Sequence, residues 1–252
     1  MSQAGQFSHA PLEEVAFEIS FFPKLKIVEK LADFQDRLAT TYPQLGEEYA
    51  FRSPDAGRDS GIIDTMKKRF SLTNPEGTRA VRLSIISLNV VERKYESFNR
   101  LKDEIIQIWN WFCDTVKDIK AQRIGLRYIN RLRIPLPCDL TKLQDITRLY
   151  FAPSRFENEE EIHVINQEAT VKRKDTLLTI RSGILGVETD LQANNKQQLI
   201  YLLDYDSSFQ LKGETVTSLD QKLDLLHDTV ESQFLNDVLP SYKEYMETGQ
   251  WK

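Results

Sequence analysis

Residues 122–134 read QRIGLRYINRLRI, and this stretch decides the fold because its side chains alternate in character. The apolar members of the alternation are Ile124, Leu126, Tyr128, Leu132 and Ile134. Successive side chains of a β-strand point to opposite faces, so this alternation predicts a strand with one buried face. Pro135 follows and is expected to end the strand.

A long helix is predicted immediately before this strand, over residues 97–120. Its apolar stripe consists of Phe98, Leu101, Ile105, Ile108, Trp109, Phe112, Val116 and Ile119. Spacings of three and four residues place these side chains on one face, which is typical of a helix packed against a core. Cys113 lies within this apolar stretch and is expected to be a small core residue.

The order of elements after residue 120 repeats the order before it. Patterns in the first half predict a strand at 14–21, a helix at 25–42, β-rich stretches at 48–51, 66–73 and 79–95, and the helix at 97–120. Patterns in the second half predict the strand 122–134, a helix at 139–151, β-rich stretches at 161–173, 176–188 and 197–211, and a helix at 217–239. Pro23 and Pro135 follow the two first strands in the same way.

We therefore predict an α+β fold with a curved, saddle-like antiparallel sheet and long helices packed on one face. The sheet would consist of two pseudo-repeated β-α-β(3–4)-α halves, residues 11–120 and 121–240. Together they would form a single compact domain, residues 1–252, with a mobile N-terminus at 1–10.

Composition narrows the function classes for this chain of 252 residues. Hydrophobic residues make up 40% and the net charge is −5, so a large core is expected and a dedicated nucleic-acid binder is disfavoured. Two cysteines suggest a reducing compartment, and no signal peptide or membrane-spanning stretch is apparent, so a cytoplasmic protein without membrane contact is expected.

Chemical motifs are few. The three histidines, His9, His163 and His227, show no zinc-binding spacing, and no glycine-rich nucleotide loop or hydrolase elbow occurs. His227 has Asp224 and Asp228 nearby, which fits either a general base oriented by a carboxylate or a salt-linked histidine on a helix surface. We predict no catalytic, cofactor-binding or metal-binding residue, and we favour a protein that is not an enzyme.

The main candidate for a binding feature is an arginine strip on the strand 122–134. Its members are Arg123, Arg127, Arg131 and Arg133, with Tyr128 on the same strand. One interpretation is an exposed strip that binds phosphate or carboxylate groups. The other is a structural one, in which Glu14 and Glu18 of the first strand pair with Arg127 and Arg131 across the sheet.

Four stretches together resemble a prokaryotic family of conserved, sporadically distributed proteins of unknown function. They are Ala10–Ile19 (APLEEVAFEI), Tyr95–Phe98 (YESF), Arg123–Arg131 (RIGLRYINR) and Leu226–His227 with Phe234. After Phe234 the chain reads Leu235-Asn236-Asp237-Val238 and departs from the hydroxyl-containing stretch of that family. The resemblance implies a length near 250 residues, a bacterial or archaeal origin and accessory, defence or toxin–antitoxin loci, and no established chemistry.

The first functional hypothesis is a non-enzymatic protein-interaction or scaffold subunit of an accessory or defence-type prokaryotic locus. Its partner would be another protein or a second copy of the chain. The alternative is a protein that binds nucleic acid or another anionic ligand through the arginine-lined face of the sheet.

Overall fold

The computed structural model describes residues 7–49, 68–136, 143–150, 165–190 and 196–250. Its strands are β1 (Leu12–Phe21), β2 (Gln44–Tyr49), β3 (Lys68–Thr73), β4 (Arg79–Leu83), β5 (Ser87–Glu92), β6 (Ala121–Pro135), β7 (Gln167–Arg173), β8 (Thr176–Asp190) and β9 (Lys196–Glu214). Its helices are α1 (Lys26–Glu29), α2 (Leu31–Leu38), α4 (Phe98–Thr115), α5 (Leu143–Ile146), α6 (Leu219–Asp237) and α7 (Pro240–Thr248).

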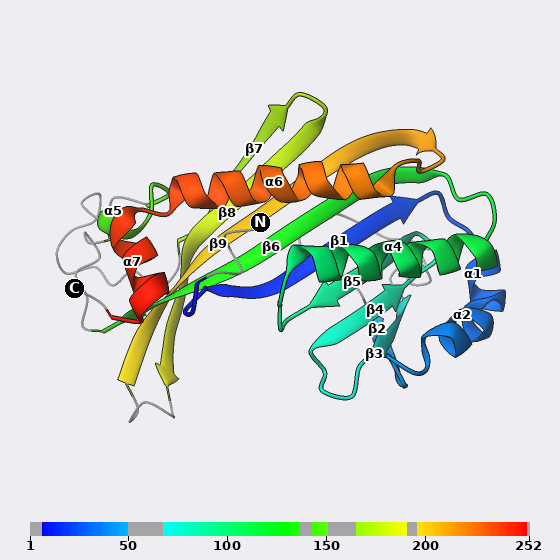
Figure 1. The fold of residues 1–252 in the computed structure, drawn as a ribbon, viewed down its shortest axis with the longest axis horizontal. Helices are drawn as coiled ribbons and strands as arrows, with labels where there is room; N and C mark the ends of the chain where they lie inside the picture. Colours follow the sequence, from blue (N-terminus) through cyan, green and yellow to red (C-terminus); the bar gives the residue numbers. More distant parts are fainter. Residues whose placement is uncertain (1–6, 50–67, 137–142, 151–164, 191–195, 251–252) are drawn as a thin grey trace, which may run out of the picture. The chain divides into compact units, whose positions relative to one another are not determined.

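The nine described strands form one antiparallel sheet, in the order β2-β3-β4-β5-β1-β6-β9-β8-β7 (Figure 1). This confirms the predicted α+β class with a large antiparallel sheet. The pseudo-repeat and the saddle shape stay predictions. No helix in the described part of the chain has both the length and the apolar character needed to cross a membrane.

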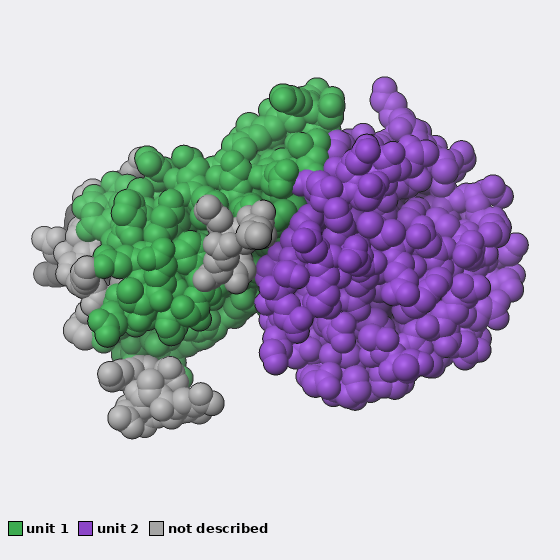
Figure 2. All heavy atoms as spheres, viewed as in Figure 1, with its two compact units in different colours: residues 1–14, 127–207, 225–252 green, residues 15–126, 208–224 purple. Residues whose placement is uncertain are grey.

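The chain divides into two compact units, each assembled from separate segments (Figure 2). Unit 1 comprises residues 1–14, 127–207 and 225–252, and unit 2 comprises residues 15–126 and 208–224. The predicted halves, 11–120 and 121–240, are instead continuous in the chain. That they are structural repeats of one another stays a prediction.

The core of unit 2 lies between α4 and the strands β1, β4 and β5. Phe112 of α4 stacks on Phe21 of β1 with ring centroids 5.5 Å apart, and it meets Phe34 of α2 edge-on at 5.9 Å. All three rings are buried. Burial of each such side chain stabilises the fold by about 2 kcal/mol, which fixes α4 on this part of the sheet.

The core of unit 1 lies between the C-terminal part of α6 and the strands β6 and β9. Phe234 of α6 meets Tyr205 of β9 edge-on, with centroids 6.2 Å apart. His227 of α6 packs against Tyr128 of β6 at 5.8 Å. These contacts explain why Tyr128 points to the helix side of β6, away from the arginine strip.

Two predicted elements prove to be broken. The helix predicted over 25–42 is split into α1 and α2 at Lys30, whose backbone (φ −100°, ψ 4°) departs from helical geometry. The β-rich stretch 79–95 is a hairpin of β4 and β5, because Ser84 turns the chain by accepting a 3.0 Å hydrogen bond from the backbone N–H of Ser87. Apolar patterning extends across both breaks and does not reveal them.

The helix predicted over 139–151 is shorter where the structure describes it. Only α5 is helical there, and Thr147 instead forms an isolated β-bridge with Val238. Residues 139–142 and 151 of that prediction lie outside the described residues.

Candidate functional site

Each member of the arginine strip has a carboxylate partner in the structure. In unit 2, Arg123 Nη1 lies 3.3 Å from Glu18 Oε1. In unit 1, Arg127 donates to both carboxylate oxygens of Asp204, from Nε at 2.8 Å and from Nη2 at 2.7 Å. Asp204 is fully buried, so this bidentate pair is the best-shielded ion pair of the strip.

The remaining two arginines of the strip share one carboxylate. Arg131 Nε lies 3.2 Å from Glu13 Oε2, and Arg133 donates to Glu13 Oε1. Glu18 therefore pairs with Arg123, while the charge of Glu14 acts on Arg127. This arrangement favours the structural interpretation of the strip over an open cationic surface.

A second polar feature, the α4 pocket, is a depression of about 650 Å³ in unit 2. Its lining consists of Thr41, Arg79, Arg100, Asp103, Glu104, Ile106, Gln107 and Asn110. Most of these side chains come from the outward face of α4, while Thr41 follows α2 and Arg79 begins β4. None of them belongs to the strip predicted from the sequence.

Two local features position the arginines of the pocket. The side chain of Ser97 caps α4 by accepting a hydrogen bond from the backbone N–H of Arg100, 3.4 Å away. Asn74 organises the turn before β4 and accepts a 2.8 Å hydrogen bond from the backbone N–H of Arg79. Arg79 is therefore fixed at the start of β4, and Arg100 is fixed in the first turn of α4.

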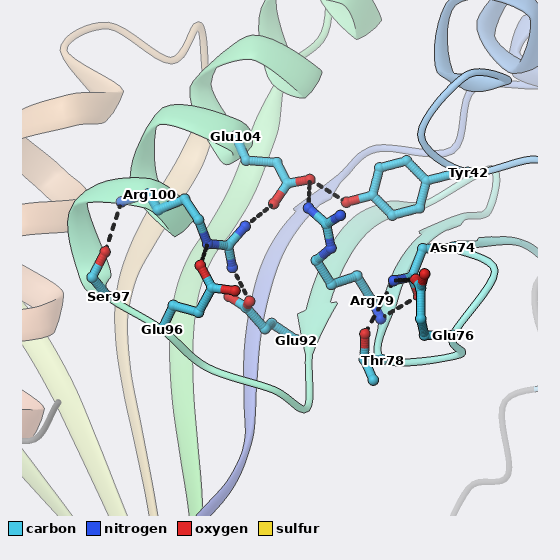
Figure 3. Close-up of polar contacts among 10 residues, drawn as sticks. All are labelled: Tyr42, Asn74, Glu76, Thr78, Arg79, Glu92, Glu96, Ser97, Arg100 and Glu104. Carbon is cyan, nitrogen blue, oxygen red and sulfur yellow. Dashed lines mark hydrogen bonds and ion pairs between the residues drawn. The ribbon is translucent and has the colours of Figure 1, made fainter. Parts of the chain in front are cut away.

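Glu104 lies between the two arginines (Figure 3). Its Oε1 accepts hydrogen bonds from Tyr42 and from Arg79 Nη1 at 3.1 Å, and its Oε2 accepts from Arg100 Nη1 at 3.1 Å. Burial, together with the hydrogen bond to Glu104, raises the pKa of the Tyr42 hydroxyl. Tyr42 therefore stays protonated as a donor at neutral pH.

Arg100 is held by three carboxylates. In addition to its contact with Glu104, Arg100 contacts Glu92 through Nη2, and its Nε lies 3.3 Å from Glu96 Oε2 (Figure 3). Glu92 is 1% exposed, and its Oε2 has no hydrogen-bond partner. An ionised buried carboxylate is costly without a cation, so Arg100 is committed to Glu92.

The two arginines of the lining and the four carboxylates around them, of which Glu92 and Glu96 lie outside the lining, together carry a negative net charge. Arg79 and Arg100 face Glu92, Glu96 and Glu104, and Asp103 is exposed beside them without an ion-pair partner among the described residues. The group thus contains two cations and four carboxylates, and both guanidinium groups point towards the carboxylates that they contact. The pocket has the chemistry to receive a further cation.

Motif searching missed this site because it contains no motif. The available signal was the spacing of Glu96, Arg100 and Glu104, four residues apart, which brings opposite charges together at the start of the predicted helix. Arg79 and Glu92 reach the site because β4 pairs with β5, and Tyr42 reaches it because of where the chain runs after α2. Local sequence patterns do not predict either arrangement.

His227 is the third feature with chemical potential, and it lies in unit 1. It is 4% exposed, and its Nδ1 is 2.8 Å from the Tyr128 hydroxyl oxygen. Its Nε2 is 3.8 Å from Glu231 Oε2. The carboxylate of Glu231, one turn after His227 on α6, thus lies near the imidazole, whereas Asp224, which the sequence placed near His227, pairs with Lys102.

Comparisons with known proteins add no assignment: no family model and no curated protein matches the chain. The resemblance to the sporadically distributed prokaryotic family therefore stays an expectation. Function must be inferred from the geometry of the described residues.

Proposed function

We propose that the protein is a non-enzymatic interaction subunit that receives a cationic segment of a protein partner in the α4 pocket. The observation that carries this proposal is the excess of carboxylates in the network at the pocket, where Arg79 and Arg100 are already bound by Glu92, Glu96 and Glu104 and Asp103 is exposed beside them. The partner would be encoded in the same accessory or defence-type locus, which is the setting that the resemblance implies.

The ion pairs of the pocket favour a cation over an anion. All three guanidinium nitrogens of Arg100 face carboxylates, and Arg79 combines its bond to Glu104 with a position 5.8 Å from the ring centroid of Tyr42. An incoming phosphate or carboxylate would have to displace these contacts. A lysine or arginine side chain would instead meet Asp103 and the amide oxygens of Gln107 and Asn110.

The lining favours a protein segment over a metabolite. Sites for small organic ligands are predominantly apolar, whereas Ile106 is the one aliphatic residue in the lining of this pocket. A lysine or arginine side chain can rest its methylene stem on Ile106 and leave its charged end among the carboxylates. The rest of the partner would then extend over the surface of unit 2.

The test is a nuclear magnetic resonance titration of the full chain with a capped peptide of lysine, arginine, glycine and serine. We expect the side-chain amide signals of Gln107 and Asn110 to shift, because both groups line the pocket. Asp103→Lys should weaken binding by about 10-fold, equivalent to 1.4 kcal/mol. Asp114→Lys is the matched control, because Asp114 is also exposed on α4 and lies outside the pocket lining.

Two results would contradict the proposal. One is an equal loss of binding in Asp103→Lys and Asp114→Lys, which would indicate a general effect of net charge. The other is a stronger response to the matching glutamate peptide, which would indicate an anion site. Co-purification from the native host with wild-type and Asp103→Lys bait would then identify the partner, and a nucleic acid recovered in place of a protein would favour the alternative hypothesis.

A further inference from the structure

A group of potential metal ligands is present on α6, and it shares no residue with the proposed partner site. His227, Asp228 and Glu231 each offer one ligand atom, and these atoms all lie within 4.8 Å of one another. His227 and Glu231 are four residues apart and Asp228 and Glu231 are three apart, so successive turns of one helix bring them together. All three residues belong to unit 1.

Tyr128 provides the support that metal-binding histidines usually have. Its hydroxyl oxygen lies 2.8 Å from Nδ1 of His227, and both side chains are buried. When Nδ1–H donates to this oxygen, the lone pair of Nε2 faces Glu231 Oε2, 3.8 Å away. A hydrogen bond to the second ring nitrogen fixes the tautomer and the ring orientation in protein metal sites.

The donor set selects the class of metal. One imidazole and two carboxylates suit Zn²⁺ or a similar first-row divalent ion, whereas Mg²⁺ and Ca²⁺ prefer oxygen ligands alone. Metal–ligand bonds are about 2.0–2.2 Å long, so the three ligand atoms must move closer together through small rotations of their side chains. Asp228 is exposed and gives the ion a route from solvent, while Glu231 is half-buried.

We propose that His227, Asp228 and Glu231 bind a divalent transition-metal ion of the Zn²⁺ class, with Tyr128 as a positioning residue and water completing the coordination. The sequence pattern is His-Asp-x-x-Glu, which the search for paired histidines and cysteines does not include. Binding here is independent of the α4 pocket, so either proposal can fail without the other.

The experiment titrates the full chain with Zn²⁺ and with Co²⁺, whose visible absorption reports nitrogen and oxygen ligation. Asp228→Asn and Glu231→Gln should each weaken binding at least about 10-fold, and His227→Ala should abolish it. Tyr128→Phe should also weaken binding by about 10-fold, although Tyr128 is not a ligand. Asp220→Asn, an exposed carboxylate elsewhere on α6, should leave the affinity unchanged.

Asp228→Asn is the decisive variant because its side chain is exposed and its loss does not threaten folding. In the wild type, Zn²⁺ should raise the melting temperature, and this rise should shrink in Asp228→Asn. The proposal is overturned if micromolar Zn²⁺ does not bind, or if Asp228→Asn and Glu231→Gln bind it as tightly as the wild type. Either outcome would leave the group as a structural contact between His227 and Glu231 on α6.

Discussion

Arginines of the same strip have different energetic roles because their partners differ in burial. Asp204, the partner of Arg127, is completely buried, and Arg181 Nη1 lies 3.4 Å from the same carboxylate. Glu13, the partner of Arg133, is partly exposed, and Arg133 itself is 43% exposed. Removing a cation is costly only where the carboxylate left behind cannot reach water.

Arg127→Ala should therefore destabilise the protein by roughly 2–3 kcal/mol, with Arg181 limiting the loss. Arg133→Ala should cost less than about 1 kcal/mol, because exposed ion pairs contribute little. Urea unfolding of the two variants measures the difference. Equal costs for both substitutions would show that burial of Asp204 does not control the stability of this strip.

At the scale of elements, the end of α6 carries a buried acid. Asp237 is 3% exposed and accepts hydrogen bonds from Gln233 Nε2 at 2.8 Å and from the Tyr205 hydroxyl at 3.1 Å. Burial raises the pKa of Asp237 above its ordinary value of 3.8, although these hydrogen bonds oppose the shift. The folded state therefore holds this proton more tightly than the unfolded state does.

This difference predicts a loss of stability with rising pH. The free energy of unfolding should fall as pH rises from about 3.8 through the raised pKa of Asp237. The fall should be about 1.4 kcal/mol for each pH unit by which the pKa of Asp237 in the folded state exceeds its pKa in the unfolded state. Asp237→Asn should remove this component, so the stability of the wild type relative to the variant should be greatest in acid. Unfolding curves from pH 3.5 to 7 measure it, with Asp220→Asn as the control for removing a carboxylate from the same helix.

Periodicity was a good guide to long elements and a poor guide to breaks. The helix predicted over 97–120 corresponds to α4, and the strand predicted over 122–134 corresponds to β6. Their patterns are long, and each buries one face against a core. The break at Lys30 and the turn at Ser84 depend on single residues within apolar patterns, so the sequence did not separate α1 from α2 or β4 from β5.

At the scale of the whole molecule, the net charge of −5 and the pairing of the strip arginines act in the same direction. Neither feature favours attraction of a polyanion. The sequence could place the arginines on one face of a strand. It could not show that Asp204 and Glu13 would meet them, because those contacts depend on which strands are neighbours in the sheet.

We expect no measurable binding of the full chain to single- or double-stranded DNA or RNA at physiological salt, about 0.15 M. Weak binding of DNA or RNA at lower salt should be unaffected by Arg131→Ala, because Arg131 is already paired with Glu13. Fluorescence anisotropy across salt concentrations provides the measurement. Tight binding that falls steeply with salt and is lost in Arg131→Ala would instead establish the strip as a phosphate-binding surface.

The buried carboxylate of Asp204 also constrains how the sheet assembles. It lies on β9 and contacts arginines from both neighbouring strands, Arg127 on β6 and Arg181 on β8. A slip of one residue in either pairing would turn an arginine to the opposite face and leave the acid without that cation. Mispaired sheets are thereby penalised during folding, and a change at Asp204 in evolution would require coordinated changes on two other strands.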